Sequence, residues 1–195
     1  MKPAVFLDRD GTINVDVGYL CHPDQFTFLP RAIEALQMLR DSDLPLIIIT
    51  NQAGVARGLI PPDRLPVIQK AFLRLMRTNN IPIAGYYSCP HHPEGVLPEY
   101  RCECECRKPA PGLLLQAARE LDIDVQRSYV VGDKASDVQL AHNADATGIL
   151  VLTGEGRKYQ QSYPSEYTPP HTICRNLYEA AEWITLREKK KSTTI

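Results

Sequence analysis

The sequence predicts an α/β protein, built as a three-layer sandwich with a mainly parallel central sheet between two layers of helices. Three observations support this fold class. Short β-branched runs such as residues 46–50 are typical of buried strands. Apolar residues at helical spacing, such as Leu65, Ile68 and Phe72, lie between these runs. Acidic residues directly follow two of the runs, at the strand ends where open α/β sheets bind ligands.

The expected elements alternate along the chain. We expect five strands, at residues 5–7, 44–50, 85–88, 128–131 and 147–152. A loop rich in turn-forming residues, at about 12–28, follows the first strand, and Pro30 opens the first helix. The helical stripes are Ile33, Leu36 and Leu39; Leu65, Ile68, Phe72 and Leu75; Leu114, Ala117, Ala118 and Leu121; and residues 177–186. Strands and helices that alternate in this way predict helices on both faces of a parallel sheet.

Length and composition indicate one domain. The 195 residues are 44 % hydrophobic, and we assign residues 1–188 to a single domain and residues 189–195 to a flexible tail. A formal net charge of -1 argues against a nucleic-acid partner. The sequence has no apolar run of about 18 residues and no secretory leader, so we expect no membrane span and a cytoplasmic protein. A monomer is the expected oligomeric state.

Two acids, Asp8 and Asp10, stand one residue apart between the first strand and Gly11. Because side chains alternate along a strand, we expect both carboxylates on one face at the strand's carboxyl end. Carboxylates this close repel each other unless a proton or a cation intervenes, and magnesium prefers such oxygen ligands. A capped turn, in which an aspartate bonds its own backbone ahead of the glycine, is the alternative.

Four segments in a fixed order resemble the motifs of the haloacid dehalogenase superfamily of phosphohydrolases. They are residues 8–12 for motif I, 46–51 for motif II, 107–109 for motif III and 129–137 for motif IV. The resemblance covers essentially the whole chain and implies a Rossmann-like fold that hydrolyses phosphate esters. Many relatives carry a large cap domain after motif I or II, but only short loops occupy those places here.

The resemblance also implies a role for individual residues. Asp8 would be the nucleophile that forms an aspartyl phosphate. Asp10 would be the general acid and later the base, which requires a pKa above that of a free aspartate. Thr50 and Lys108 would hold the oxygens of the transferring phosphoryl group. Magnesium would be held by Asp8, the backbone carbonyl of Asp10, and Asp133.

The cysteines supply a second pattern. One loop carries Cys89, His91 and His92 at its start and, at its end, Cys102, Cys104 and Cys106. Paired soft ligands at both ends of a loop suit a structural, tetrahedral zinc site. Scattered reduced cysteines and disulfides are the alternatives, and disulfides fit poorly with a chain that has no export signal. The isolated Cys21 and Cys174 are interpreted as small apolar residues or unreactive thiols.

The zinc loop narrows the resemblance. It ends in Cys-Glu-Cys-Arg-Lys-Pro, and Asp16-Val17-Gly18-Tyr19 follows motif I, as in the D-glycero-D-manno-heptose 1,7-bisphosphate phosphatase family. Histidinol phosphatases carry a similar loop with a shorter insert, so residues 93–103 favour the heptose family. The family pattern makes the zinc ligands Cys89, His91, Cys104 and Cys106. Whether Cys102 replaces Cys104 as a zinc ligand stays open.

The resemblance implies a phosphatase that removes the C7 phosphate of a heptose 1,7-bisphosphate, whose anomer the sequence leaves open. The implied substrate-binding residues are Asp16, Val17, Gly18, Tyr19, Thr50, Asn51, Gln52, Ala53, Arg107, Lys108 and Lys134. Residues 16–19 and the zinc loop would form the roof of the site, with Arg107 against a second phosphate. The roles of Asp137 and Arg57 stay open. Two alternative functions are a histidinol-phosphate phosphatase and a non-catalytic, zinc-stabilised module that binds phosphate groups or nucleic acid.

Overall fold

The computed structural model describes residues 1–193 and places six strands in one sheet. The strand order is β3-β2-β1-β4-β5-β6, and each pair of neighbours is parallel. The strands are β1 (Val5–Leu7), β2 (Leu46–Asn51), β3 (Gly85–Cys89), β4 (Tyr129–Gly132), β5 (Thr147–Val151) and β6 (Thr172–Cys174). The predicted α/β fold class, with its parallel central sheet, is confirmed.

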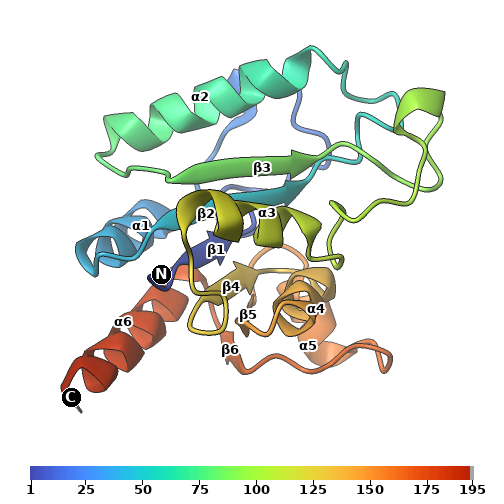
Figure 1. Ribbon diagram of the computed structural model, residues 1–195. Coiled ribbons are helices and arrows are strands. Elements are labelled where there is room, and N and C mark those ends of the chain that lie inside the picture. Colours follow the sequence, from blue (N-terminus) through green and yellow to red (C-terminus); the bar gives the residue numbers. More distant parts are fainter. Residues whose placement is uncertain (194–195) are drawn as a thin grey trace.

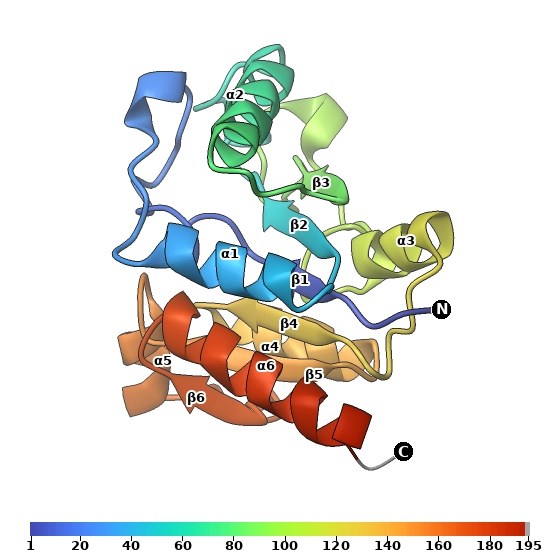
Figure 2. The same ribbon diagram turned by 90° about the vertical axis from the view of Figure 1, so that its left-hand side faces the viewer.

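Helices cover both faces of the sheet. They are α1 (Ala32–Asp41), α2 (Arg64–Thr78), α3 (Gly112–Leu121), α4 (Ala135–Asn143), α5 (Gly156–Gln161) and α6 (Leu177–Thr193), with short 3-10 helices η1 (Pro23–Gln25) and η2 (Pro98–Tyr100). Figure 2 shows α1 and α6 side by side on one face of the sheet, with α3 and α4 behind it. The chain therefore forms three layers.

Strand β1 shows how the sequence produces this packing. Its side chains alternate between two apolar clusters, with Val5 and Leu7 in one and Phe6 in the other. The first cluster includes Phe72 of α2, and the second includes Leu114 of α3. Because both faces are covered, β1 is apolar at every position, as parallel strands usually are.

The chain order creates a switch point at β1 and β4. From β1 the chain proceeds through β2 to β3 at one edge of the sheet, and the later strands extend from β4 to β6 at the other. Adjacent parallel strands that lead into loops running in opposite directions leave a crevice at their carboxyl ends. In Figure 1, β2 and β3 point to the right, toward the yellow-green loop that follows β3.

Some details differ from the expectation. The first helix begins at Ala32, after Arg31 with a left-handed φ of 63°, and strand β6 was not predicted. Helix α6 continues to Thr193, so residues 189–193 are helical where a flexible tail was expected. The end of that predicted tail, residues 194 and 195, lies outside the described residues. Within residues 1–193, the helices are too short or too polar to cross a membrane.

Candidate active site

A pocket of about 590 Å³ lies at the carboxyl ends of the strands. Many of the predicted site residues line it: Asp8, Asp10, Asp16, Gly18, Tyr19, Thr50, Asn51, Gln52, Ala53, Arg107, Lys108 and Lys134. Two of the predicted catalytic, substrate-binding and magnesium-binding residues do not. Val17 is 46 % exposed on the surface, and Asp133 is completely buried.

Three buried acids meet beside this pocket. Asp8 directly follows β1, Asp133 directly follows β4, and Asp137 lies in the first turn of α4. Each offers a carboxylate oxygen within 4.8 Å of the others. Burial and the neighbouring negative charges raise the pKa of Asp133 to about 8. Burial likewise raises the pKa of Asp8 to about 6, although Lys108 opposes the shift.

Glycine backbones enclose Asp133. Gly11 has a left-handed φ of 85°, and a Cβ atom there would lie 2.3 Å from Oδ2 of Asp133. A Cβ atom on Gly154 would lie 2.1 Å from the same oxygen. Oδ2 accepts a hydrogen bond from the Glu155 backbone N–H at 2.8 Å, whereas Oδ1 is buried with no hydrogen-bond partner among the described residues. An unpartnered carboxylate oxygen beside two other acids fits a cation ligand.

Lys108 is the cation that the structure places among these acids. Its ammonium donates to Oδ1 of Asp8 at 2.6 Å and to the Ile49 carbonyl at 2.9 Å, and lies 2.6 Å from Asp137. Burial lowers the pKa of Lys108, but the two carboxylates outweigh this effect and raise it. The Asn51 side chain fixes the Lys108 backbone, because it accepts from its N–H and donates to its carbonyl.

Asp10 differs from the sequence-based expectation. Its carboxylate accepts hydrogen bonds from Arg9, Asn14 and Gln52, and Gln52 also donates to the hydroxyl of Thr50. Burial alone would raise the pKa of Asp10, but the Arg9 charge and these hydrogen bonds lower it. The predicted elevation of this pKa is therefore wrong for the protein without substrate, since its donors stabilise the ionised form.

Ion pairs connect the loop after β1 to the motif IV lysine. The ammonium of Lys134 lies 3.1 Å from Asp16 and 3.7 Å from Glu155. The Gly18 N–H donates to Asp16, so this acid also orders its own loop. Tyr19 accepts a hydrogen bond from Arg57 at 2.9 Å. Asp16 and Tyr19, two of the predicted roof residues, therefore line the pocket and contact Lys134 and Arg57.

One wall of the pocket was missed by the sequence reasoning. Glu155, Tyr159 and Tyr167 line the pocket from the segment that follows β5. The acid follows the carboxyl end of a parallel strand, so the rule that located Asp8 and Asp133 also applied to it. No spacing in the sequence marks the two tyrosines as pocket residues.

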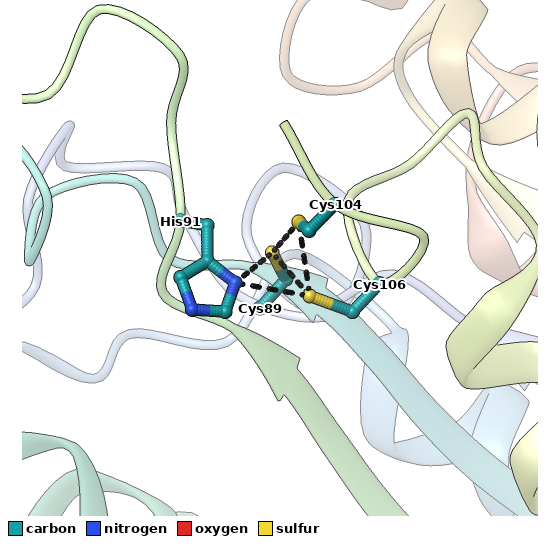
Figure 3. Close-up of side chains that lie close together, drawn as sticks. All are labelled: Cys89, His91, Cys104 and Cys106. Atoms are coloured by element: carbon teal, nitrogen blue, oxygen red, sulfur yellow. Dashed lines mark hydrogen bonds between the residues drawn. The ribbon is translucent and has the colours of Figure 1, made fainter. Parts of the chain in front are cut away.

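A cluster of cysteine and histidine ligands joins the end of β3 and the start of the following loop to the far end of that loop. Figure 3 shows the side chains of Cys89, His91, Cys104 and Cys106 pointing toward one another. The sulfur of Cys106 is 3.1 Å from those of Cys89 and Cys104 and 3.2 Å from Nδ1 of His91. All six cysteines are free, and Cys102 is exposed outside the cluster. The four converging atoms form a candidate metal site, whereas Cys102 takes no part in it.

The loop around this cluster places two arginines at the pocket. Arg107 directly follows Cys106 and donates a hydrogen bond to the His91 carbonyl at 3.3 Å. The guanidinium of Arg57 lies 3.1 Å from Nε2 of His92. Both arginines line the pocket. The cluster therefore lies next to the positive side of the site.

Comparison with known proteins agrees with this geometry. Residues 105–180 match the family model described as HAD-hydrolase-like. The D-glycero-beta-D-manno-heptose-1,7-bisphosphate 7-phosphatase of Yersinia pestis is 44% identical over 154 residues, which cover 78% of this chain and 82% of that protein. The protein of the same name from Pasteurella multocida is 43% identical over 171 residues, covering 85% and 92% of the two chains.

A solved structure is also similar. The D,D-heptose 1,7-bisphosphate phosphatase from B. bronchiseptica, complexed with magnesium and phosphate, has a TM-score of 0.80 and 34% identity. The match covers 96% of this chain and 99% of that one. With its motif residues gathered at the switch point of the sheet, the chain belongs to the D-glycero-beta-D-manno-heptose-1,7-bisphosphate 7-phosphatase family of HAD-like hydrolases.

Proposed function

We propose that this chain is a magnesium-dependent phosphatase that removes the C7 phosphate of D-glycero-D-manno-heptose 1,7-bisphosphate and leaves the heptose 1-phosphate. The observation that carries the proposal is the position of Asp8. Its carboxylate lines an open pocket, touches Lys108 and lies within 4.8 Å of two further buried acids. Membership of the family supplies the substrate.

The acidic cluster suits magnesium. The proposed ligands are Asp8, Asp133 and the backbone carbonyl of Asp10, and Asp137 lies close enough to support them. The support for this assignment is the unpartnered Oδ1 of Asp133 and the raised pKa of its carboxyl group. When bound, the ion would supply positive charge between the Asp8 carboxylate and the phosphoryl group and would orient that group.

In the first step, a carboxylate oxygen of Asp8 attacks phosphorus. An Asp8–phosphorus bond forms, and the bond from phosphorus to the C7 oxygen of the sugar breaks. Asp10 gives its proton to the departing oxygen, which leaves as a hydroxyl group. Lys108 and the hydroxyl of Thr50 hold the equatorial oxygens of the transferring group, over which the negative charge spreads.

In the second step, water attacks the phosphorus of the aspartyl phosphate. Asp10, now ionised, takes a proton from that water, the Asp8–phosphorus bond breaks, and inorganic phosphate leaves. The donors around Asp10 favour the ionised form that this step requires. For the first step, the negative phosphate of the bound substrate would raise the pKa of Asp10 and let it carry a proton.

The rest of the substrate would meet the pocket rim. Arg107 is proposed to hold the second phosphate or the sugar hydroxyls, because a planar guanidinium binds phosphate through two parallel hydrogen bonds. Arg57 lines the same side of the pocket. Residues 16–19 and the loop after β3 would form the roof, together with Lys134.

The cluster of Cys89, His91, Cys104 and Cys106 is proposed to hold structural zinc. On tetrahedral zinc with bonds of about 2.3 Å, sulfur ligands lie about 3.8 Å apart. The separation of 3.6 Å between Cys89 and Cys104 is close to that value. The separations of 3.1 Å from Cys106 are shorter, so binding zinc would need only a small outward shift of the sulfur of Cys106. Bound zinc would fix the loop and thereby the adjacent Arg107. The need for reduced thiols supports a cytoplasmic location, and a monomer is the proposed oligomeric state.

A substrate comparison tests the proposed function. Steady-state rates would be measured with both anomers of the heptose bisphosphate and with histidinol phosphate, each with magnesium. We expect a heptose bisphosphate to give the highest kcat/KM, and a higher value for histidinol phosphate would overturn the substrate assignment. Asp8→Asn should abolish turnover while the circular dichroism and zinc content stay unchanged. Normal turnover by that variant would rule out the mechanism.

A further inference from the structure

Arg9 lies between the two acids of motif I, and it takes no part in the two proposed catalytic steps. It is the largest of the fully buried side chains, and its side chain is only 1% exposed. Arginine is rarely buried this completely, because a charge loses its hydration when it leaves water. A buried ion pair often stabilises a fold no better than apolar residues of the same volume. Stability alone therefore does not explain Arg9.

The Arg9 guanidinium donates a hydrogen bond to each of the two carboxylate oxygens of Asp10. Nε donates to Oδ1 at 3.0 Å, and Nη2 donates to Oδ2 at 2.5 Å. Two parallel hydrogen bonds of this kind fix the plane of a carboxylate as well as its position. Asn14 donates to Oδ1 at 2.9 Å and Gln52 to Oδ2 at 3.0 Å, so each oxygen has two donors.

Arg9 is itself held from the opposite side. Its Nη1 donates to the hydroxyl oxygen of Tyr86, on β3, at 2.9 Å. Its central carbon lies 5.6 Å from the ring centroid of Phe26, a distance at which cations and aromatic faces attract. Phe72 of α2 packs against the rings of Phe26 and Tyr86, with a centroid distance of 5.8 Å to each. The guanidinium is therefore anchored to the apolar core.

We infer that Arg9, braced by Tyr86, is a positioning residue that fixes the orientation of the Asp10 carboxylate for proton transfer to the leaving oxygen. The inference rests on the proposed function, because it assumes that Asp10 is the general acid. A general acid works only within about 2.6–3.2 Å of the oxygen that it protonates. A lysine in place of Arg9 keeps the charge but lacks the planar, two-point grip.

The test compares two phosphate esters that differ in leaving group. The leaving group of a sugar phosphate is an unstable alkoxide, which needs a proton from the general acid. The leaving group of p-nitrophenyl phosphate is a stable phenolate, which needs none. The measured quantity is kcat/KM, which covers only the steps up to departure of the leaving group. Arg9→Lys and Tyr86→Phe are the variants. Tyr87→Phe is the matched control, because its hydroxyl, next along β3, donates to the exposed carboxylate of Glu120 at 2.6 Å.

We expect Arg9→Lys to lower kcat/KM for the heptose bisphosphate about 100-fold, and for p-nitrophenyl phosphate less than about 5-fold. Tyr86→Phe should show the same selectivity with a smaller loss of about 5-fold on the sugar ester. Tyr87→Phe should leave both values unchanged. Equal losses on the two esters would overturn the inference, since a merely structural role affects both alike. Unchanged hydrolysis of the sugar ester would also overturn it.

Two further outcomes, misfolding of a variant and failure of the proposed function, can be distinguished from failure of this inference. If Arg9→Lys does not fold, as judged by circular dichroism and Tm, Tyr86→Phe decides the question. If the parent chain hydrolyses neither ester with magnesium, the proposed function fails, and this inference fails with it. A parent chain that is active, with variants that lose both esters equally, refutes only the positioning role of Arg9.

Discussion

The ammonium nitrogen of Lys108 lies 2.6 Å from the carboxylate oxygen Oδ1 of Asp8, and both side chains are buried. Asp137 lies at the same distance on another side of the ammonium. One cation therefore neutralises part of a buried acidic cluster at the point where a phosphoryl group would meet its nucleophile. The interaction links catalysis to stability, because both depend on the same charge.

Lys108→Met should impair both properties. We expect kcat to fall about 100-fold or more, because a preorganised charge on the phosphoryl group is lost. The free energy of unfolding should fall by about 3–5 kcal/mol in magnesium-free buffer, where buried carboxylates lose their partner. Magnesium should reduce that loss, because it supplies positive charge to the same acids. Urea unfolding with and without magnesium tests this, with Lys70→Met, an exposed lysine of α2, as the control. Equal destabilisation in both buffers would contradict it.

Asp133 predicts a pH dependence of magnesium binding. The pKa of this carboxyl is raised from its ordinary value of 3.8 to about 8, so the folded state holds a proton that the unfolded state releases. Its contribution to the stability of the metal-free protein is full below the ordinary pKa and is lost as the pH rises through about 8.

A bound cation takes the place of that proton. The increase in Tm caused by magnesium should therefore grow as the pH is raised from about 6 to about 9, as thermal melts would show. Asp133→Asn should remove most of this dependence. A magnesium-induced shift that is constant over this pH range would contradict the prediction.

Two cysteines of one loop form a matched pair for the zinc proposal. Cys106→Ser should lose zinc and make residues 90–106 sensitive to proteolysis, because a closed four-ligand site needs every member. Cys102→Ser should retain one zinc ion per chain, because Cys102 is exposed outside the cluster. Metal analysis of the two purified variants is the measurement. Zinc loss in Cys102→Ser with retention in Cys106→Ser would reverse the assignment.

Arg107→Met should weaken recognition of the second phosphate. We expect KM for the heptose bisphosphate to rise about 10-fold to 100-fold, the effect of losing a charge-assisted hydrogen bond. KM for a heptose monophosphate that carries only the C7 phosphate should change little. Arg101→Met, at an exposed arginine of the same loop, is the control. A similar rise in KM for both substrates would contradict phosphate recognition and would place Arg107 on the sugar hydroxyls instead.

The pattern around Asp10 shows where sequence reasoning reached its limit. Alternation along a strand predicted that Asp8 and Asp10 would share a face and repel. Strand β1 ends at Leu7, so alternation no longer governs the second acid. Its hydrogen-bond partners include Gln52, which lies 42 residues away in the sequence. A contact over this separation depends on tertiary packing, which local periodicity does not reveal.

Other parts of the site were accessible from the sequence. The family resemblance placed Asp133 beside Asp8, because it implied that both hold the same magnesium ion. No strand order was predicted from the sequence, and the structure makes the preceding strands β1 and β4 parallel neighbours. The ligand spacing in the loop after β3 predicted a cluster that the structure brings together. Strand β6 was missed because three residues at the edge of a sheet carry too little periodicity. Tyr159 and Tyr167 were missed for the same lack of a local pattern.

The walls of the pocket come from separate segments, which follow β1, β2, β3, β4 and β5. The buried acids Asp8 and Asp133 come directly after β1 and β4, next to the sheet, whereas the pocket residues Asp16, Arg107 and Glu155 lie farther along their loops. Insertions or replacements in one loop can therefore alter which phosphate ester is accepted while the hydrolytic chemistry stays intact. Such a division of labour lets evolution diversify metabolite selectivity on an unchanged scaffold.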